Sequence, residues 1–160
     1  MEFRKHPGSY AEGAYAVVYF VEDRAIKVFK RRTEASDEHV RAVFGSEIEA
    51  YRQALCADDL RELVRHFIGA TTCCAITNVD GTDISKQFYL YCAYEMVRVH
   101  GDFRKFGTLS SEITEYLRRR FNAAGIFHLV DSSIVLDVES RPRHIGDFAM
   151  REYEVIDRSP

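Results

Sequence analysis

The stretch AEGAYAVVYFVEDRAIKVFK, residues 11–30, decides the fold prediction. It contains two apolar runs, Ala16–Val21 and Ala25–Phe29, which are rich in β-branched and aromatic residues. The acidic pair between them is typical of a tight turn, so we predict a hairpin of two buried strands. Gly13 is the one glycine of the stretch, and it precedes the hairpin in a loop whose backbone N–H groups could approach a phosphate closely.

Lys27 is the most informative residue of this hairpin. In strand alternation it shares a face with Ala25 and Phe29, and that face is mostly apolar. A lysine on such a face must either extend outward to solvent or meet a negative partner. An edge-strand lysine is the simple interpretation, and a cation directed at phosphate oxygens is the alternative.

Outward from the hairpin, strand-rich and helical segments follow one another. Residues 36–55 have apolar residues at helical spacing, and Ser36 is suited to cap that helix. The other predicted elements are a shorter helix over 58–67, strands over 68–79 and 87–97, a helix over 110–124, and short strands over 134–138 and 144–145. This order predicts an α+β fold rather than a parallel sheet of βαβ units.

Composition limits the classes of function. A length of 160 residues fits one domain, and a net charge of −3 with mixed signs does not indicate general nucleic-acid binding. The four cysteines have no CxxC spacing, so zinc is not indicated and reduced thiols in a cytosol-like compartment fit best. No apolar run reaches about 18 residues, so we expect neither a membrane span nor Sec-type export, although a signal for a specialised secretion system is invisible to this criterion.

Two glutamates on the predicted helix 36–55 are candidate partners of Lys27. Glu47 lies one turn before Tyr51, which places it beside the apolar stripe of the helix. We therefore prefer Glu47, and Glu49 is the alternative. A carboxylate at this position could pair with the lysine and direct its ammonium group at phosphate oxygens.

Two aspartates in the last third of the chain are candidates for metal binding and proton transfer. Asp147 follows Gly146, and a carboxylate in such a turn suits Mg²⁺ that is also held by substrate phosphates. Asp131 could orient a hydroxyl nucleophile. The plain alternative is a pair of turn aspartates.

The segment Tyr94-Glu95-Met96-Val97 closes a predicted strand over 88–94 and runs into a polar segment. A strand that ends in this way can leave backbone groups to bond the edge of an adenine. Taken alone, the segment is an ordinary strand end.

In their order along the chain, these motifs resemble those of a protein kinase. AEGAYAVVY resembles the glycine-rich loop, with Ala11 and Ala16 in place of its first and third glycines. AIK resembles the strand that carries the ATP-pairing lysine. YEMV resembles the hinge, with Tyr94 as gatekeeper, and GDF resembles the start of the metal-binding DFG motif, with Ala149 in place of the last glycine.

The resemblance covers about residues 9–150 and implies a minimal protein-kinase-like fold. It implies one domain over 1–160, with an antiparallel-sheet N-lobe and hinge over about 9–97, containing one or two helices, and a much reduced helical C-lobe over 98–160. The implied cofactors are ATP and Mg²⁺ or Mn²⁺. The implied ATP-binding residues are Gly13, Val18, Ala25, Lys27, Glu47, Glu95 and Val97, the catalytic residues are Lys27 and Asp131, and the metal ligand is Asp147.

The catalytic loop matches the kinase pattern in two ways. If His128 stands for the loop histidine, Asp131 is the base, displaced by one inserted residue. If the match is anchored on the strand that follows, His128 falls at the position of the base and Ser133 at that of the metal-binding asparagine. We prefer Asp131, because phosphoryl transfer needs an acceptor group near the attacking hydroxyl.

The resemblance extends to minimal effector kinases that some pathogenic bacteria deliver into host cells, because the 13 residues that follow Asp147 are too few for an activation segment and substrate-binding helices. A truncated chain is the alternative explanation. It implies a Ser/Thr kinase that acts as a monomer on a host protein in the host cytoplasm, with the ninety-kilodalton heat-shock chaperone as one candidate. A cytoplasmic protein is the other expectation for location. A pseudokinase acting as a binding module and a transferase of AMP are the alternatives. With Cβ atoms at Ala11 and Ala16, we expect ATP binding to be weak and strongly metal-dependent.

Overall fold

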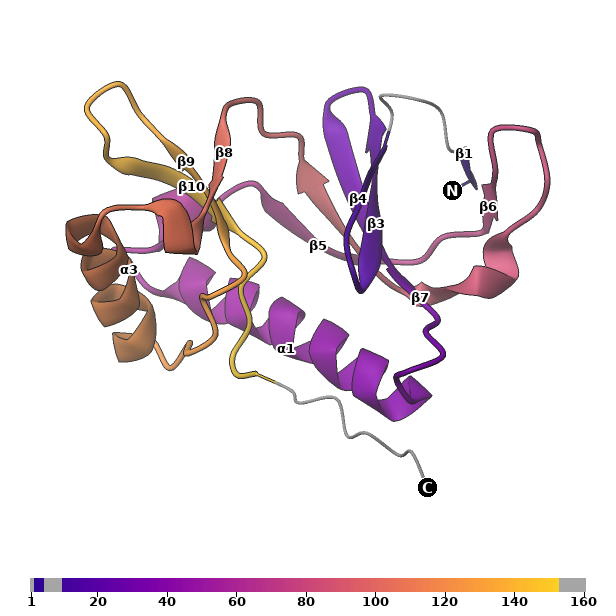
Figure 1. Ribbon diagram of the computed structural model, residues 1–160, viewed down its shortest axis with the longest axis horizontal. Coiled ribbons are helices and arrows are strands. Elements are labelled where there is room, and N and C mark those ends of the chain that lie inside the picture. Colours follow the sequence, from indigo (N-terminus) through magenta and orange to yellow (C-terminus); the bar gives the residue numbers. More distant parts are fainter. Residues whose placement is uncertain (1, 5–9, 153–160) are drawn as a thin grey trace. The chain divides into compact units, whose positions relative to one another are not determined.

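The computed structural model describes residues 2–4 and 10–152, and these residues form two compact units (Figure 1). Unit 1 contains the described residues up to 44 together with 68–98. Unit 2 contains 45–67 and 99–152. The segment 45–67, which the sequence analysis assigned to the N-terminal part, therefore groups with the C-terminal part.

Unit 1 is built on a five-stranded sheet with the order β2-β3-β4-β7-β5. Its strands are β2 (Tyr10–Glu12), β3 (Ala16–Val21), β4 (Arg24–Lys30), β5 (Phe67–Thr71) and β7 (Phe88–Val97). A separate parallel pair joins β1 (Glu2–Arg4) to β6 (Ala75–Thr77), and a short 3-10 helix, η1 (Ser85–Gln87), precedes β7. The β3 and β4 strands pair antiparallel through a turn at Glu22, which has a positive φ of 53°, so the predicted hairpin is confirmed.

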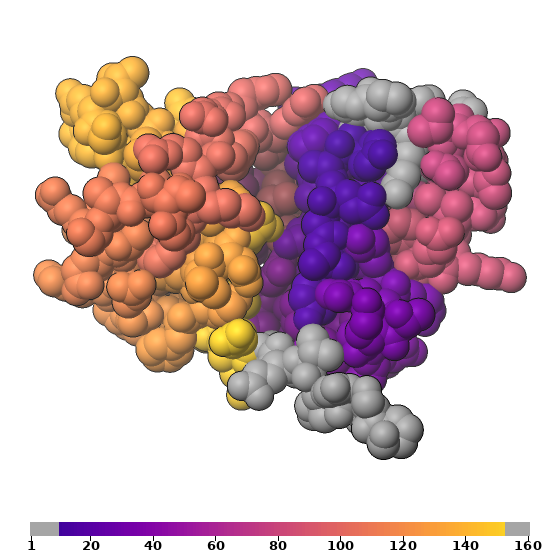
Figure 2. All heavy atoms as spheres, in the orientation of Figure 1, coloured from indigo at the N-terminus to yellow at the C-terminus, as the bar shows by residue number. Residues whose placement is uncertain are grey.

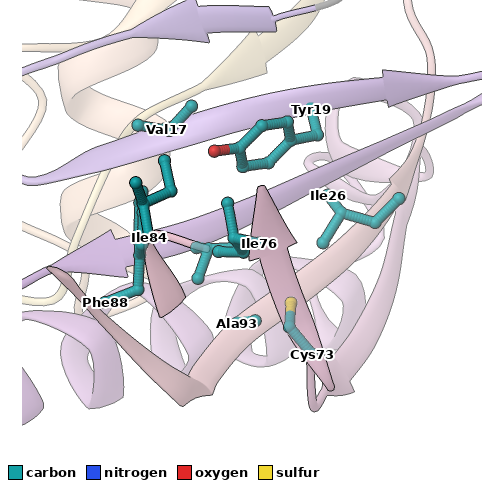
Figure 3. Close-up of a cluster of buried hydrophobic side chains, with 9 residues drawn as sticks. Val17, Tyr19, Ile26, Cys73, Ile76, Ile84, Phe88 and Ala93 are labelled. Atoms are coloured by element: carbon teal, nitrogen blue, oxygen red, sulfur yellow. The ribbon is translucent and has the colours of Figure 1, made fainter. Parts of the chain in front are cut away.

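The core of unit 1 lies against one face of this hairpin (Figure 3). Val17 and Tyr19 are two positions apart on β3, so their side chains point to the same face of the sheet. Ile26 of β4 is the cross-strand partner of Tyr19 and points to that face as well. Figure 3 shows them gathered with Ile76 and Ile84 from the segment around β6. Each of these side chains contributes about 1.5–3 kcal/mol by leaving water, which is why the alternating pattern fixes the register.

The long helix α1 (Asp37–Cys56) begins in unit 1 and ends in unit 2. The Ser36 hydroxyl accepts a hydrogen bond from the backbone N–H of His39 at 3.1 Å, which confirms the predicted N-cap. In unit 1, Phe44 of this helix packs edge-on against Phe29 of β4, with 5.5 Å between ring centroids. The helix therefore covers the β4 face opposite to the core cluster.

Two predicted elements are shorter than expected. The helix expected over 58–67 is reduced to one turn, α2 (Arg61–Val64), because Phe67 already begins β5. The strand expected over 68–79 is divided into β5 and β6, which belong to different sheets. In both places pairing with distant strands overrides the local pattern.

Unit 2 contains an antiparallel sheet with the order β10-β9-β8 and the helix α3. Their bounds are β8 (Phe103–Lys105), η2 (Phe106–Thr108), α3 (Ser111–Ala123), β9 (Ser133–Leu136) and β10 (Pro142–Gly146). Ser110 caps α3 by accepting from the N–H of Ile113 at 3.4 Å. The predicted helix and the two short strands are confirmed, whereas β8 lies in a segment that we expected to be irregular. Figure 2 shows the outer surface of the segment that includes α3, in orange.

The α+β class is confirmed, with mostly antiparallel strands and few helices. No helix among the described residues is long and apolar enough to cross a membrane. This agrees with the expectation that the sequence contains no membrane-spanning helix.

Candidate functional site

The ammonium group of Lys27 is buried in unit 1. The residue is only 8% exposed, and β4 lies between β3 and β7, so the edge-strand interpretation is wrong. Its Nζ atom lies 5.4 Å from the ring centroid of Phe29 and 5.7 Å from that of Tyr94. Aromatic faces attract a cation but do not replace water around it fully, so a buried ammonium at this position calls for an anionic partner.

Two other predicted ATP-binding residues share the face of Lys27. Val18 is its cross-strand neighbour on β3, and Ala25 lies two residues earlier on β4. Directly opposed residues and residues two apart point to the same side of a sheet. The structure thus brings Val18, Ala25 and Lys27 together on one face of the sheet.

The loop that contains Gly13 is a tight turn, in which the Gly13 N–H donates to the carbonyl of Ala16 at 2.9 Å. Gly13 is not among the residues with a positive φ, and a Cβ added to it would meet its nearest neighbour at an ordinary 3.7 Å. Neither backbone conformation nor space requires glycine here in the folded chain. Ala11 is exposed on β2, whereas Ala16 is buried at the start of β3.

The hinge-like segment differs from the expectation in one respect. β7 covers Phe88–Val97, which confirms the strand expected over 87–97. The strand therefore does not end at Tyr94, as the hinge-like segment suggested, but stays paired with β4 as far as Arg24. The Arg98 N–H donates to the carbonyl of Asp23 at 2.7 Å, in the register of the β4–β7 ladder. Because backbone groups alternate in direction along a strand, those of Glu95 and Val97 point to the side of β7 away from β4.

In unit 2, the burial of α1 distinguishes the two candidate glutamates. Glu47 is 8% exposed, whereas Glu49 is exposed to solvent. Tyr51, one turn further, is buried and stacks on Phe67 with 4.6 Å between ring centroids. Glu47 therefore lies on the inward face of the helix, as its spacing from Tyr51 predicts.

Asp147 lies in a strained and well-supported turn of unit 2. Its φ of 59° is in the left-handed region, which non-glycine residues rarely adopt and which is frequent at functional sites. The preceding Gly146 is paired with Ser133 in the β10–β9 ladder. The following Phe148 is fully buried between Tyr51 and Phe121, at centroid distances of 4.5 and 5.1 Å. The backbone at Asp147 is thus anchored on both sides.

The residues after Phe148 are held by backbone hydrogen bonds. Ala149 and His128 exchange two such bonds, both 3.1 Å long. The N–H of Met150 donates to the Ser46 hydroxyl at 3.0 Å, and its carbonyl accepts from the N–H of Phe127 at 3.0 Å. The segment that carries Asp147 is therefore fixed between α1 and the loop of His128.

We expect Ser46→Ala to lower the free energy of unfolding by about 1–2 kcal/mol, because the half-buried N–H of Met150 loses its best acceptor. The side chain of Ser46 is buried, so water cannot replace it easily. Urea denaturation followed by circular dichroism measures the change, with the exposed Ser111→Ala as the matched control. Equal stability of the two variants would show that Ser46 does not anchor the segment.

Four polar residues form a cluster beside this segment, which we call the loop cluster: Lys105, His128, Asp131 and Ser133. His128 Nε2 and Asp131 Oδ2 lie 3.0 Å apart. Lys105 Nζ donates to the carbonyl of Asp131 at 3.4 Å and to the hydroxyl of Ser133 at 3.2 Å. Both candidates for the base position therefore meet in one place, and the carboxylate of Asp131 is the more exposed of the two.

A groove of about 540 Å³ borders the loop cluster. Its walls include Phe106, Phe127, His128 and Val130, and Arg118 of α3 contributes a positive charge. Phe127 and Val130 are 65% and 62% exposed, an unusual degree for apolar side chains next to a groove. The groove therefore opens next to Asp131, since its lining includes Val130.

The described residues contain no group of three or more His, Cys, Asp or Glu side chains that could hold a metal by themselves. Mg²⁺ does not need such a group, because it is usually held by one or two carboxylates together with substrate phosphates and water. Asp147 offers the hard oxygen donor that this requires. The residues present fit a metal that arrives with a nucleotide.

Sequence reasoning missed three residues of unit 2. Ser46 and Lys105 had no local signal, because their roles depend on pairing with segments far along the chain. His66 is buried and lies 5.6 Å from His144 between ring centroids, and an isolated histidine in an apolar stretch gave no hint of this contact. Burial lowers the pKa of His66 to about 4.

No protein-family model matches the chain, and neither a curated protein nor a solved structure matches it.

Proposed function

We propose that this chain is an ATP-dependent protein Ser/Thr kinase of a minimal, atypical type, with a kinase-like fold. The observation that carries the proposal is the anchored turn of Asp147 beside the pair formed by His128 and Asp131. Phosphoryl transfer requires an oxygen ligand for the metal of Mg-ATP and an acceptor near the attacking hydroxyl. Unit 2 supplies both within one segment.

The nucleotide is proposed to use the face of unit 1 that carries Lys27. Val18 and Ala25 would contact the adenine, the backbones of Glu95 and Val97 would bond its edge, and the loop of Gly13 would cover the phosphates. Lys27 would contact the phosphates. Its burial supports this role, because a buried ammonium needs an anionic partner.

In the proposed reaction, the hydroxyl oxygen of a Ser or Thr acceptor attacks the γ-phosphorus. The new O–P bond forms while the bond from the γ-phosphorus to the β–γ bridging oxygen breaks, and ADP leaves. Asp131 orients the hydroxyl and accepts its proton, and His128 holds the carboxylate in place. Mg²⁺ or Mn²⁺, held by Asp147 and the phosphates, would neutralise charge on the phosphate oxygens.

The acceptor is proposed to be a protein, and the groove beside the loop cluster supports this choice. Its exposed apolar side chains and Arg118 suit a polypeptide segment rather than a small metabolite. The resemblance to effector kinases extends the proposal to a host protein as the acceptor.

The test combines ATP binding with transfer. We expect Mg-ATP to raise the melting temperature, since a ligand of the native state stabilises it, with a much smaller shift without metal. Mass spectrometry should detect phosphate on a generic Ser/Thr-rich acceptor protein or ADP released by transfer to water. Asp147→Asn should lower this turnover about 100-fold or more, whereas Asp102→Asn, at an exposed aspartate of unit 2, should not.

Three other outcomes would overturn the proposal. No shift with ATP in the presence of Mg²⁺ or Mn²⁺ would indicate a binding module without nucleotide chemistry. Binding without turnover, or turnover equal in wild type and Asp147→Asn, would indicate a pseudokinase. A mass increase that corresponds to AMP would replace phosphoryl transfer by nucleotidyl transfer.

A further inference from the structure

Lys105 lies beside the loop that carries Asp131. It ends β8, and its cross-strand partner in the β8–β9 ladder is Ser133. The next residue, Phe106, donates its N–H to the carbonyl of Ser132 at 3.0 Å. The backbone on both sides of Lys105 is therefore tied to the loop that carries Asp131.

The contacts of its ammonium group are all to neutral oxygens. Nζ donates to the carbonyl of Asp131 at 3.4 Å and to the hydroxyl of Ser133 at 3.2 Å. Within the described residues of unit 2, Arg118, Arg120 and Arg141 all have carboxylates within 4.0 Å, whereas Lys105 has none. An ammonium has three N–H donors, so one donor of Lys105 remains for a further acceptor.

An ammonium group without a carboxylate partner is suited to bind a substrate anion, which is present only during the reaction. A transferring phosphoryl group spreads its negative charge over three oxygens, and fixed positive charge beside it lowers the barrier. Ser133 accepts from Lys105, so the hydroxyl hydrogen of Ser133 can itself point to a phosphoryl oxygen. Lys105 also contacts the backbone of Asp131, the residue proposed to hold the attacking hydroxyl.

We propose that Lys105 is a further catalytic residue, whose ammonium group contacts the transferring phosphoryl group with the help of the Ser133 hydroxyl. The inference rests on the proposed function. The bonds that form and break are those of the proposed phosphoryl transfer: the acceptor oxygen bonds to the γ-phosphorus, ADP leaves, and Asp131 takes the proton. Lys105 contributes a positive charge and Ser133 a hydrogen bond to the oxygens of the transferring phosphoryl group. The loop has no asparagine that could hold a second metal ion.

Three variants of the full chain test this role. Lys105→Met removes the charge and keeps the stem, Lys105→Arg keeps the charge, and Arg104→Met removes a neighbouring exposed charge of β8, whose contact is to the carbonyl of Thr108. Turnover of Mg-ATP and the melting temperature are measured for each. We expect Lys105→Met to lower kcat about 100-fold with little change in the KM for ATP or in melting temperature, Lys105→Arg to recover a large part, and Arg104→Met to match wild type.

The outcomes separate this inference from the function on which it rests. Wild-type turnover with an unchanged kcat in Lys105→Met would overturn the role of Lys105 alone. A loss of kcat that is equal in Lys105→Met and Lys105→Arg and follows a fall in melting temperature would show that Lys105 only fastens β8 to the loop. Absence of turnover in wild type would overturn both proposals together.

Discussion

Replacing Lys27 by methionine should abolish ATP-dependent phosphoryl transfer, lowering turnover by about 100-fold or more. The ammonium group is buried next to the rings of Phe29 and Tyr94, so no solvent cation can take its place efficiently. Methionine has nearly the same length and fills the same apolar surroundings, but it brings no charge to the phosphates. The measurement is turnover of Mg-ATP under conditions that saturate the wild-type protein.

The matched control is Lys30→Met on the same strand. Lys30 is half-buried, and its Nζ lies 3.2 Å from Oε1 of Glu12, so it already has a partner outside the proposed site. We expect this variant to keep its turnover. If Lys27→Met is as active as Lys30→Met, the lysine of the AIK motif has no part in transfer.

The elements that the sequence predicts well are those with strong local signals. The β3–β4 hairpin has two uninterrupted apolar runs around an acidic turn, and α1 and α3 each begin with a serine whose side chain caps the helix. The strand β8 has no such signal, because all three of its residues are exposed. It therefore lacks the alternation of buried apolar and exposed polar residues that predicts a strand. The helix expected over 58–67 fails for another reason, since its last residue, Phe67, belongs to a sheet strand.

In the candidate site, too, features with a local sequence signal are predicted, and features that depend on distant contacts are not. The burial of Lys27 follows from its apolar neighbours on β4, and the inward position of Glu47 rather than Glu49 follows from helical phase. The strand over 87–97 is predicted from the sequence, but the pairing of its last residues with the start of β4 follows only from the folded chain. The contact between Ser46 and Met150 joins residues 104 positions apart, and such contacts follow only from the folded chain.

Acidification should destabilise the fold through His66, and this is the second large effect that we expect. The side chain is 7% exposed, and its Nδ1 atom has no hydrogen-bond partner among the described residues. Its ring lies edge-on to Tyr51 and to His144, at centroid distances of 5.9 and 5.6 Å. Burial and the neighbouring His144 lower the pKa of His66 to about 4, against the opposing effect of Asp147.

The sign follows from proton linkage. With a pKa of about 4 in the folded chain and about 6.5 in the unfolded chain, His66 binds a proton more tightly after unfolding. Its contribution to stability is therefore complete above pH 6.5 and is lost as the pH falls toward 4. The loss reaches about 3 kcal/mol, at 1.36 kcal/mol for each pKa unit. His144 acts in the same direction, because burial, Arg143 and Arg65 lower its pKa as well.

Urea denaturation between pH 7.5 and pH 4.5 measures this loss directly. We expect His66→Phe, which keeps an aromatic ring against Tyr51 and removes the titrating group, to flatten much of the pH dependence. The exposed His100→Gln is the control and should leave the dependence as in wild type. Other carboxylates contribute to acid unfolding in every variant, so the difference between His66→Phe and wild type is the decisive quantity. Parallel curves for the two proteins would show that His66 is not protonated on unfolding in this pH range and that another group carries the acid sensitivity.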